Sequence, residues 1–277
     1  GDTTATVTVT IATVPQAGSG GRLAICSNDA PQDLFESLGG TPDAGGTWTP
    51  ALASGTGLFD PAQDSAGSYT YSVTTTCGTD SATVVVALIP QPDITGLTLD
   101  ADTICLEDAI DITLSGASQL ADGNYSLNYS LSGANITEQT IIVTIASGST
   151  VINIPASQLS TVGTTTFTIL NLLDPVTNCG TASGTLPTID FNIEQAPTPQ
   201  LITDGNSFCT DDNATIADLT SNLVNGDVVT WYDALENGNA YPEDTPLVNG
   251  QIYYASNSTN NGCSTGIRLA VTVSIDT

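Results

Sequence analysis

The cysteines of this chain recur in a pattern that constrains the fold more than any other feature. Six cysteines fall into three successive pairs along 277 residues. In the first and third pairs a tryptophan lies 22 residues after the leading cysteine, Trp48 after Cys26 and Trp231 after Cys209, and the chain contains no other tryptophan. A shared spacing of this kind indicates that one structural unit has been copied. The sequence therefore predicts an array of small domains and not a single large enzyme.

We expect the cysteines to form one disulfide within each copy, because the pairs are local in sequence and fit an oxidising compartment. The predicted pairs are Cys26 with Cys77, Cys105 with Cys179, and Cys209 with Cys263. Zinc binding is the alternative, but the chain has no CxxC motif and no histidine. Tyr71 lies six residues before Cys77, whereas the corresponding tyrosine of an immunoglobulin domain lies two residues before its cysteine. Each bridge is therefore expected to tie the start of a domain to the far end of a late strand, near the linkers.

The charge of the chain excludes several classes of function. It has 29 acidic residues against two arginines, no lysine and no histidine, which gives a net charge of −27. Nucleic-acid binding is excluded because it needs basic side chains that displace counterions from phosphates. Binding to anionic membrane surfaces is excluded because the negative charge of the chain is repelled by them. Histidine-based nucleophilic catalysis is impossible, and no catalytic residues are assigned. No stretch approaches 18 consecutive apolar residues, so no direct membrane insertion is expected.

Alternation of apolar and polar residues predicts strands almost throughout the chain. The clearest segments are residues 5–11, 82–88, 188–193 and 269–275. Helical periodicity is absent apart from a turn near residues 32–38. These patterns predict an all-β fold: a tandem array of three immunoglobulin-like β-sandwich domains in an extended arrangement, each with one intradomain disulfide.

Proline-marked connectors set the expected domain boundaries. Such connectors follow strands at residues 14–16, 89–92 and 196–200, where proline ends strand pairing and stiffens a short linker. The expected repeats are residues 13–91, residues 92–196, which are longer and lack tryptophan, and residues 197–277. Residues 1–12 are interpreted as the last strand of an upstream repeat, so the chain is expected to be a piece of a longer array.

The recurring aromatic residues have two interpretations. Trp48 and Trp231 are expected on central strands with their rings packed between the two sheets, as the strand-C tryptophan of immunoglobulin-like domains is. Tyr71 and Tyr253 precede the trailing cysteines and are expected to belong to the same scaffold. The alternative for the tryptophans is an exposed surface that stacks against a sugar.

Acidic residues also recur in register with the cysteines. Asp29, Asp108 and Asp212 each stand three residues after a leading cysteine. One interpretation is capping of backbone N–H groups at a turn, and the other is a calcium site beside a linker. The densest group, and therefore the candidate calcium site, comprises Asp100, Asp102, Glu107 and Asp108. No other cofactor is expected.

Several segments of the sequence resemble a known group of proteins. Residues 33–48 (DLFESLGGTPDAGGTW), 57–61 (GLFDP) and 66–71 (AGSYTY), together with Trp231-Tyr232-Asp233 and Tyr253-Tyr254-Ala255, resemble the immunoglobulin/PKD-like repeats of giant surface proteins of Bacteroidota, which include gliding-motility adhesins. The resemblance implies an acidic filament that is exported by type IX secretion and associated with the outer membrane. It also implies O-glycosylation at Asp-Ser/Thr motifs, which this chain has at Thr3, Ser65, Ser81 and Thr103.

These observations leave three functional hypotheses open. The first is a non-catalytic structural or adhesive stalk of an extracellular cell-surface adhesin, in gliding motility or surface attachment. Its partners would be neighbouring repeats of the same chain and, beyond them, surface polysaccharide or other adhesin chains. The second hypothesis is a carbohydrate- or surface-binding module, and the third is an accessory part of a secreted hydrolase.

Overall fold

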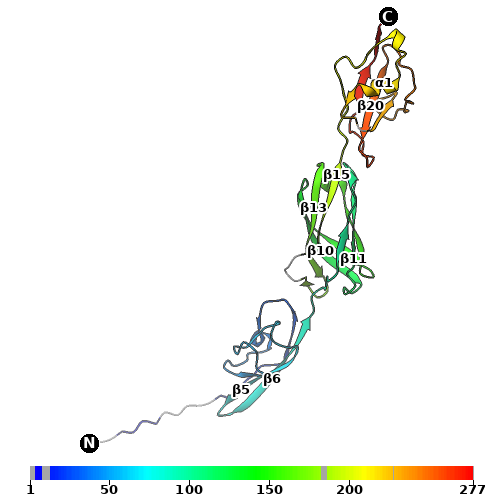
Figure 1. Ribbon diagram of the computed structural model, residues 1–277. Coiled ribbons are helices and arrows are strands. Elements are labelled where there is room, and N and C mark those ends of the chain that lie inside the picture. The colour runs from blue at the N-terminus through cyan, green and yellow to red at the C-terminus, as the bar shows by residue number, and fades with distance from the viewer. Residues whose placement is uncertain (1–3, 8–12, 182–185, 227, 277) are drawn as a thin grey trace. The chain divides into compact units, whose positions relative to one another are not determined.

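The computed structural model describes residues 4–7, 13–181, 186–226 and 228–276 (Figure 1). The chain divides into two compact units. Unit 1 comprises Gly1–Asp93 and Leu172–Gly184, and unit 2 comprises Ile94–Asn171 and Thr185–Thr277. The strands form three successive immunoglobulin-like β-sandwiches, which we call the first (β1–β6), second (β7–β15) and third (β16–β22) sandwich.

The first sandwich lies in unit 1 and has a four-stranded sheet in the order β1-β6-β5-β3, with a two-stranded sheet of β2 and β4. Its elements are β1 (Gly21–Cys26), β2 (Gln32–Asp33), the 3₁₀ helix η1 (Leu34–Ser37), β3 (Thr47–Thr49), β4 (Leu58–Phe59), β5 (Gly67–Thr75) and β6 (Gly78–Ile89). The Asp33 side chain begins η1 by accepting the Phe35 N–H through Oδ1 at 2.9 Å.

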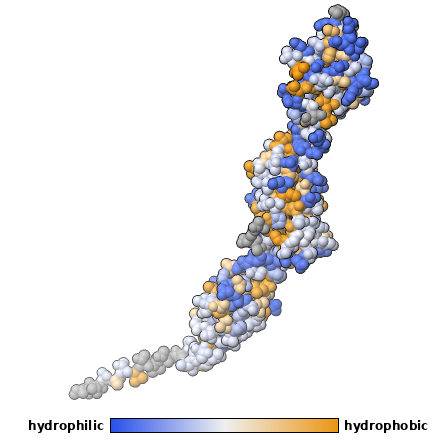
Figure 2. Space-filling model, viewed as in Figure 1, coloured by the Kyte–Doolittle hydropathy of each residue, from blue (hydrophilic) through white to orange (hydrophobic). Residues whose placement is uncertain are grey.

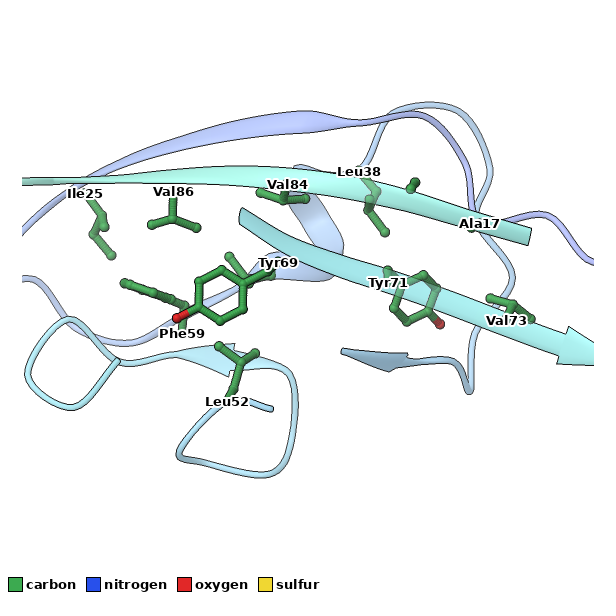
Figure 3. Packing of buried hydrophobic residues seen from close by; sticks show 12 residues of the cluster. Ala17, Ile25, Leu38, Leu52, Phe59, Tyr69, Tyr71, Val73, Val84 and Val86 are labelled. Carbon is green, nitrogen blue, oxygen red and sulfur yellow. The ribbon is translucent and has the colours of Figure 1, made fainter. Parts of the chain in front are cut away.

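The core of the first sandwich follows from alternation along its two long strands. Tyr69, Tyr71 and Val73 of β5 are buried, as are Val84 and Val86 of β6. In Figure 3, Tyr69 lies beside Phe59 and Leu52 at one end of this core, and Tyr71 and Val73 lie farther along β5. The rings of Phe59 and Tyr69 meet edge to face with centroids 5.6 Å apart, a favourable aromatic geometry.

The second sandwich has a six-stranded sheet in the order β11-β10-β13-β15-β8, with β14 paired to β13, and a three-stranded sheet β12-β9-β7. Its elements are β7 (Thr98–Asp100), β8 (Ile104–Cys105), β9 (Ile110–Ser115), β10 (Gly123–Gly133), β11 (Thr137–Ile145), β12 (Thr150–Ile154), the 3₁₀ helix η2 (Ala156–Gln158), β13 (Gly163–Asp174), β14 (Cys179–Gly180) and β15 (Thr188–Glu194). Alternate residues of β9 and β10 are buried, which is the signature of half-buried strands.

The third sandwich lies in unit 2 and consists of the sheet β19-β20-β21 and the pairs β16–β18 and β17–β22. Its elements are β16 (Gln200–Leu201), β17 (Ser207–Cys209), the 3₁₀ helix η3 (Thr210–Asp212), α1 (Ile216–Ser221), β18 (Leu223–Val224), β19 (Val228–Tyr232), β20 (Ile252–Ser258), β21 (Leu269–Thr272) and β22 (Ser274–Asp276).

A capping box begins α1, the only α-helix among the described residues. The Thr215 N–H and hydroxyl both donate to the Asp218 carboxylate, at 2.8 and 2.9 Å. These two hydrogen bonds, chiefly the one from the Thr215 N–H, stabilise the ionised carboxylate and hold the pKa of Asp218 below its usual range. At pH values above the ordinary pKa of an aspartate, the cap therefore stabilises the fold fully. This stabilisation is lost as the pH falls through the lowered pKa of Asp218.

One topological feature is common to all three sandwiches. The strand that ends in the leading cysteine pairs in parallel with the last strand of the same sandwich: β1 with β6, β8 with β15, and β17 with β22. Because the pairing is parallel, the leading cysteine lies where the last strand ends and the chain leaves the sandwich.

The all-β fold and the tandem of immunoglobulin-like sandwiches agree with the sequence prediction, and the strands expected at residues 82–88, 188–193 and 269–275 are present. The turn near residues 32–38 is η1. The six-residue helix α1 was not predicted, because its apolar positions are too few to show helical periodicity. Residues 5–7 of the expected strand 5–11 are not in a strand, and residues 8–12 lie outside the described residues. The repeat boundaries remain predictions.

The surface mixes polar residues with separate apolar patches, as Figure 2 shows for one face. Several large apolar side chains are exposed singly, including Val176 at 91% and Ile136 at 84%, and isolated exposed apolar residues of this kind are common on protein surfaces. Within the described ranges, no helix has the length and apolar character needed to cross a bilayer.

Two adjacent residues of β6 provide a matched test of the core. Val84 is fully buried and Val85 is 44% exposed. We expect Val84→Ala to lower the free energy of unfolding by about 2 kcal/mol, because it removes two buried methyl groups and leaves a cavity. The neighbouring Val85→Ala should change it by less than about 0.5 kcal/mol. Urea unfolding followed by circular dichroism measures both values, and equal losses would contradict the assigned faces of β6.

Candidate functional site

The leading cysteines occupy equivalent positions in the three sandwiches. Cys26 pairs in register with Ile89, Cys105 with Glu194, and Cys209 with Asp276, each partner lying at the end of the last strand. The local turn is also shared. Asp29 accepts the Cys26 N–H at 3.0 Å and Asp212 accepts the Cys209 N–H at 2.7 Å, in both cases through Oδ2. In the second sandwich the Asp108 N–H donates to the Cys105 carbonyl at 3.1 Å, as the Asp29 N–H does to the Cys26 carbonyl.

The trailing cysteines lie in the connections that precede the last strands. Cys77 lies in the turn between β5 and β6, Cys179 follows the turn after β13, and Cys263 lies between β20 and β21. Each is held by the same contact, in which the cysteine N–H donates to a threonine hydroxyl at 3.2 to 3.4 Å. A trailing cysteine therefore precedes the last strand, at the end where the chain enters the sandwich.

The disulfides join different cysteines from those predicted. Among the described residues, Cys26 is bonded to Cys179 with their Cα atoms 5.6 Å apart, and Cys105 is bonded to Cys263 with their Cα atoms 5.2 Å apart. The first bond lies within unit 1 and the second within unit 2. The predicted pairs Cys26–Cys77, Cys105–Cys179 and Cys209–Cys263 are therefore wrong. Each observed bond joins a leading cysteine to the trailing cysteine of the next pair along the chain.

Strand length explains the error. In the first sandwich, Cys26 lies beside Ile89 at one end of the 12-residue strand β6, and Cys77 directly precedes Gly78 at the other end. A strand of that length spans roughly 36 Å at about 3.3 Å per residue, whereas bonded cysteines need Cα atoms within about 7 Å. Cys26 and Cys77 therefore cannot bond to each other, because they lie at opposite ends of the same sandwich.

Contacts on the linker side reinforce the second disulfide within unit 2. The Asn261 amide, two residues before Cys263, donates to both oxygens of Glu194 at 3.1 Å, and Glu194 is the register partner of Cys105. The Asn257 amide donates to the Pro197 carbonyl at 3.3 Å. The hairpin that carries the trailing cysteine therefore contacts both the last strand of the second sandwich and the linker that follows it.

Trp231 is a core residue, as the sequence predicts. Its side chain is 1% exposed, and its indole N–H donates to the Thr220 hydroxyl of α1 at 2.9 Å. Tyr253 is also buried, and its hydroxyl accepts the Val248 N–H at 3.0 Å. Burial raises the pKa of the Tyr253 hydroxyl. Neither ring is available to a ligand.

Trp48 differs from Trp231 although the spacing to the leading cysteine is the same. It is half-buried and lines a groove of about 500 Å³ in unit 1. Its ring lies 5.1 Å from that of the buried Tyr71, whose ring also meets Phe35 edge to face at 5.3 Å. The Tyr71 hydroxyl accepts the Gly46 N–H and donates to the Asp43 carbonyl, both at 2.8 Å. Tyr71 is thus fixed scaffold, while Trp48 and Phe35 form an accessible aromatic wall.

Two glycines line this groove close to its aromatic rings. A Cβ atom at Gly46 would lie 2.5 Å from the Tyr71 ring, and one at Gly57 would lie 3.4 Å from the Trp48 indole nitrogen. Gly57 also has a φ of +88°, which side chains rarely adopt. The groove was not anticipated as a site, although the glycines that flank Trp48 in the sequence were a signal for it.

The acidic residues behave as caps. Asp29 and Asp212 satisfy backbone N–H groups of the leading-cysteine turns, as the capping interpretation predicts. The candidate calcium ligands Asp100, Asp102, Glu107 and Asp108 are not brought together: the described residues contain no group of three or more His, Cys, Asp or Glu side chains able to hold a metal ion. Asp100 ends β7, while Glu107 lies in the turn after β8 with a φ of +74°.

The predicted glycosylation positions are accessible where they are described. Ser65, Ser81 and Thr103 are exposed, which an acceptor hydroxyl requires. Thr3 lies outside the described residues. Modification at these positions remains a prediction.

Comparison with known proteins finds a family model that matches one part of the chain. The sequence model of the family described as "Ig-like domain CHU_C associated" matches residues 196–276, which are the third sandwich. No curated protein matches the chain.

Several solved structures show a likeness to the chain. An I-band fragment of titin is 9% identical, with a TM-score of 0.36, over 96% of this chain and 100% of the titin chain. The N-terminal eight Ig domains of Down Syndrome Cell Adhesion Molecule are 13% identical, with a TM-score of 0.36, over 94% of this chain and 36% of the other. Extracellular domains 3–5 of Drosophila OTK are 14% identical, with a TM-score of 0.24, over 95% and 97% of the two chains.

The disulfide connectivity is directly testable by peptide mapping. Because the chain has no lysine, the alkylated, unreduced protein should be digested with a protease that cuts beside acidic residues, which separates all six cysteines. We expect linked peptides for Cys26–Cys179 and Cys105–Cys263, and alkylated Cys209. A Cys26–Cys77 or Cys209–Cys263 peptide would contradict the structure.

Proposed function

We propose that this chain is a non-catalytic stalk segment of a large exported cell-surface adhesin, built to transmit tension through covalently cross-linked immunoglobulin-like repeats. The observation that carries the proposal is the pair of disulfides between successive cysteine pairs. A disulfide within a sandwich would stabilise that sandwich alone, whereas a bond from one pair to the next carries tension past the connector between them.

The two disulfide loops overlap, and the overlap makes them redundant. The Cys26–Cys179 loop spans 153 residues and the Cys105–Cys263 loop spans 158 residues, and residues 105–179 belong to both. A chain pulled from its ends follows the shortest covalent path, so either disulfide alone removes a similar length from that path. Failure of one bond therefore leaves the segment protected by the other. In the chain-entropy model, a loop of this length also stabilises the fold by about 5 kcal/mol.

The chemistry of the surface supports an exported location. Disulfides persist outside the reducing cytosol, and the chain carries a net charge of −27, which keeps neighbouring filaments apart and discourages strand edges from pairing. The family matched by residues 196–276 is associated with Bacteroidota. We propose on this basis that the parent protein is a gliding-motility or attachment adhesin similar to SprB, exported by type IX secretion and associated with the outer membrane. Its partners would be neighbouring repeats, surface polysaccharide or other adhesin chains.

Stretching single molecules tests the proposed tension path. The Cys105–Cys263 disulfide joins residues 158 positions apart and by itself removes that length from the extended path. Reduction should therefore lengthen the fully unfolded chain by about 55 nm, at roughly 3.5 Å per residue. Force spectroscopy with and without a thiol reductant measures this increment.

Serine variants supply the controls for the stretching experiment. The single variant Cys105→Ser should still hide the 153 residues closed by Cys26–Cys179, and only the double variant Cys26→Ser/Cys105→Ser should show the full length without reductant. A full-length extension of the oxidised wild-type chain would contradict the proposal.

The groove beside Trp48 favours a second function, the binding of a neutral carbohydrate. Its accessible aromatic wall of Trp48 and Phe35 suits stacking against a sugar face, and the acidic chain disfavours anionic polysaccharides. Titration with neutral glucan and chitin oligosaccharides should shift the Trp48 fluorescence. Trp48→Phe should abolish the response, whereas buried Trp231 should contribute nothing to it. No shift at millimolar oligosaccharide would exclude this function.

A further inference from the structure

Cys209 has the position of a disulfide cysteine but belongs to neither disulfide of the described chain. We propose that Cys209 is the leading half of a third bond of the same kind, whose other half is the trailing cysteine of an immunoglobulin-like repeat that follows in the parent polypeptide. The inference rests on the proposed function, because it requires the array to continue with the same connectivity.

The first step is that Cys209 matches two cysteines whose bonding is known. Cys26 and Cys105 each end the strand that pairs in parallel with the last strand of their sandwich, and Cys209 ends β17 in the same relation to β22. Both Cys26 and Cys105 are bonded to the trailing cysteine of the next pair. The same rule applied to Cys209 points to a trailing cysteine beyond residue 277.

The second step excludes the partner that sequence alone suggests. Cys263, the trailing cysteine of the same pair, is already bonded to Cys105. It precedes the last strands of the third sandwich, whereas Cys209 lies beside Asp276 where those strands end. Cys209 therefore lies at the end of the sandwich where the last strand ends, which is where the proposed following repeat would begin.

The third step is that capping and bonding are compatible at this position. The Cys209 N–H donates to Asp212 and its side chain accepts the Asp212 N–H. The bonded Cys26 makes the same backbone contact with Asp29, so the turn does not compete with a disulfide. The Cys209 side chain is exposed, and an exposed thiol without a partner is unusual in a disulfide-containing exported chain.

The chemistry of the step is ordinary thiol oxidation. The Cys209 thiol and the partner thiol lose two protons and two electrons as the S–S bond forms. The electrons reduce another disulfide to two thiols, either that of an oxidoreductase in the exporting compartment or glutathione disulfide in the test tube.

An extended chain tests the inference. Residues 1–276 are followed directly by a second copy of residues 195–277, so that Asp276 takes the place of Glu194 before Gln195. This junction is chosen because Asp276 pairs with Cys209 as Glu194 pairs with Cys105. The exposed Ile267 is changed to Val in the appended copy, which gives the appended Cys263 peptide its own mass.

After refolding in glutathione disulfide, peptide mapping should link Cys209 to the marked Cys263 peptide in most molecules. In the matched Cys209→Ser chain, the marked Cys263 should become alkylated while Cys26–Cys179 and Cys105–Cys263 remain. Alkylated Cys209 in an extended chain whose appended repeat has a native near-ultraviolet spectrum would overturn the inference. The Cys105–Cys263 peptide in the same digest reports separately on the proposed function, since its absence would defeat that proposal first.

A second measurement guards against an appended repeat that does not fold. The parent polypeptide, alkylated on intact cells before any reduction and then digested, should contain Cys209 in a disulfide with a cysteine outside residues 1–277. Recovery of alkylated Cys209 from that material would equally overturn the inference.

Discussion

The parallel pairing of the leading strand with the last strand of each sandwich is the constraint on which the covalent structure depends. It places Cys26, Cys105 and Cys209 beside the residues at which the last strands end. In the first sandwich, the turn before β6 places Cys77 at the other end of that strand, a full strand length from Cys26. A bond between Cys26 and Cys77 is then geometrically impossible. A bond from one pair to the next is the arrangement that these positions allow.

This connectivity changes what a disulfide does for the protein. A bond inside a sandwich would constrain only the unfolded state of that domain, whereas loops of 153 and 158 residues that overlap constrain two successive repeats together. The hydrogen bonds from Asn261 to Glu194 and from Asn257 to Pro197 occur beside one such bond. The acidic surfaces of neighbouring repeats repel one another, which works against compact assembly. A disulfide withstands this repulsion better than weak non-covalent contacts do.

The two tryptophans show how the same spacing leads to different environments. Trp231 lies in a five-residue strand, and Thr220 of α1 accepts its indole N–H. Trp48 lies in a three-residue strand at the edge of its sheet, paired with β5 alone and flanked by glycine loops. Both rings pack on a core, but only the second contributes to an accessible groove. Whether each tryptophan is a core residue or lines a surface groove depends on which element covers its ring. The 22-residue spacing from the leading cysteine does not specify that element.

The sequence by itself determined the class of fold and the chemistry that the protein lacks. Period-two strands, proline connectors and recurring cysteines predict the tandem β-sandwiches, and the absence of lysine and histidine removes whole classes of mechanism. The capping role of Asp29 and Asp212 was also among the stated interpretations. Only the tertiary structure decided the cysteine partners, the exposure of Trp48 and the dispersal of Asp100, Asp102, Glu107 and Asp108. Proximity in sequence does not measure distance across a folded sandwich, because a fully extended strand carries neighbouring cysteines to opposite ends of the domain.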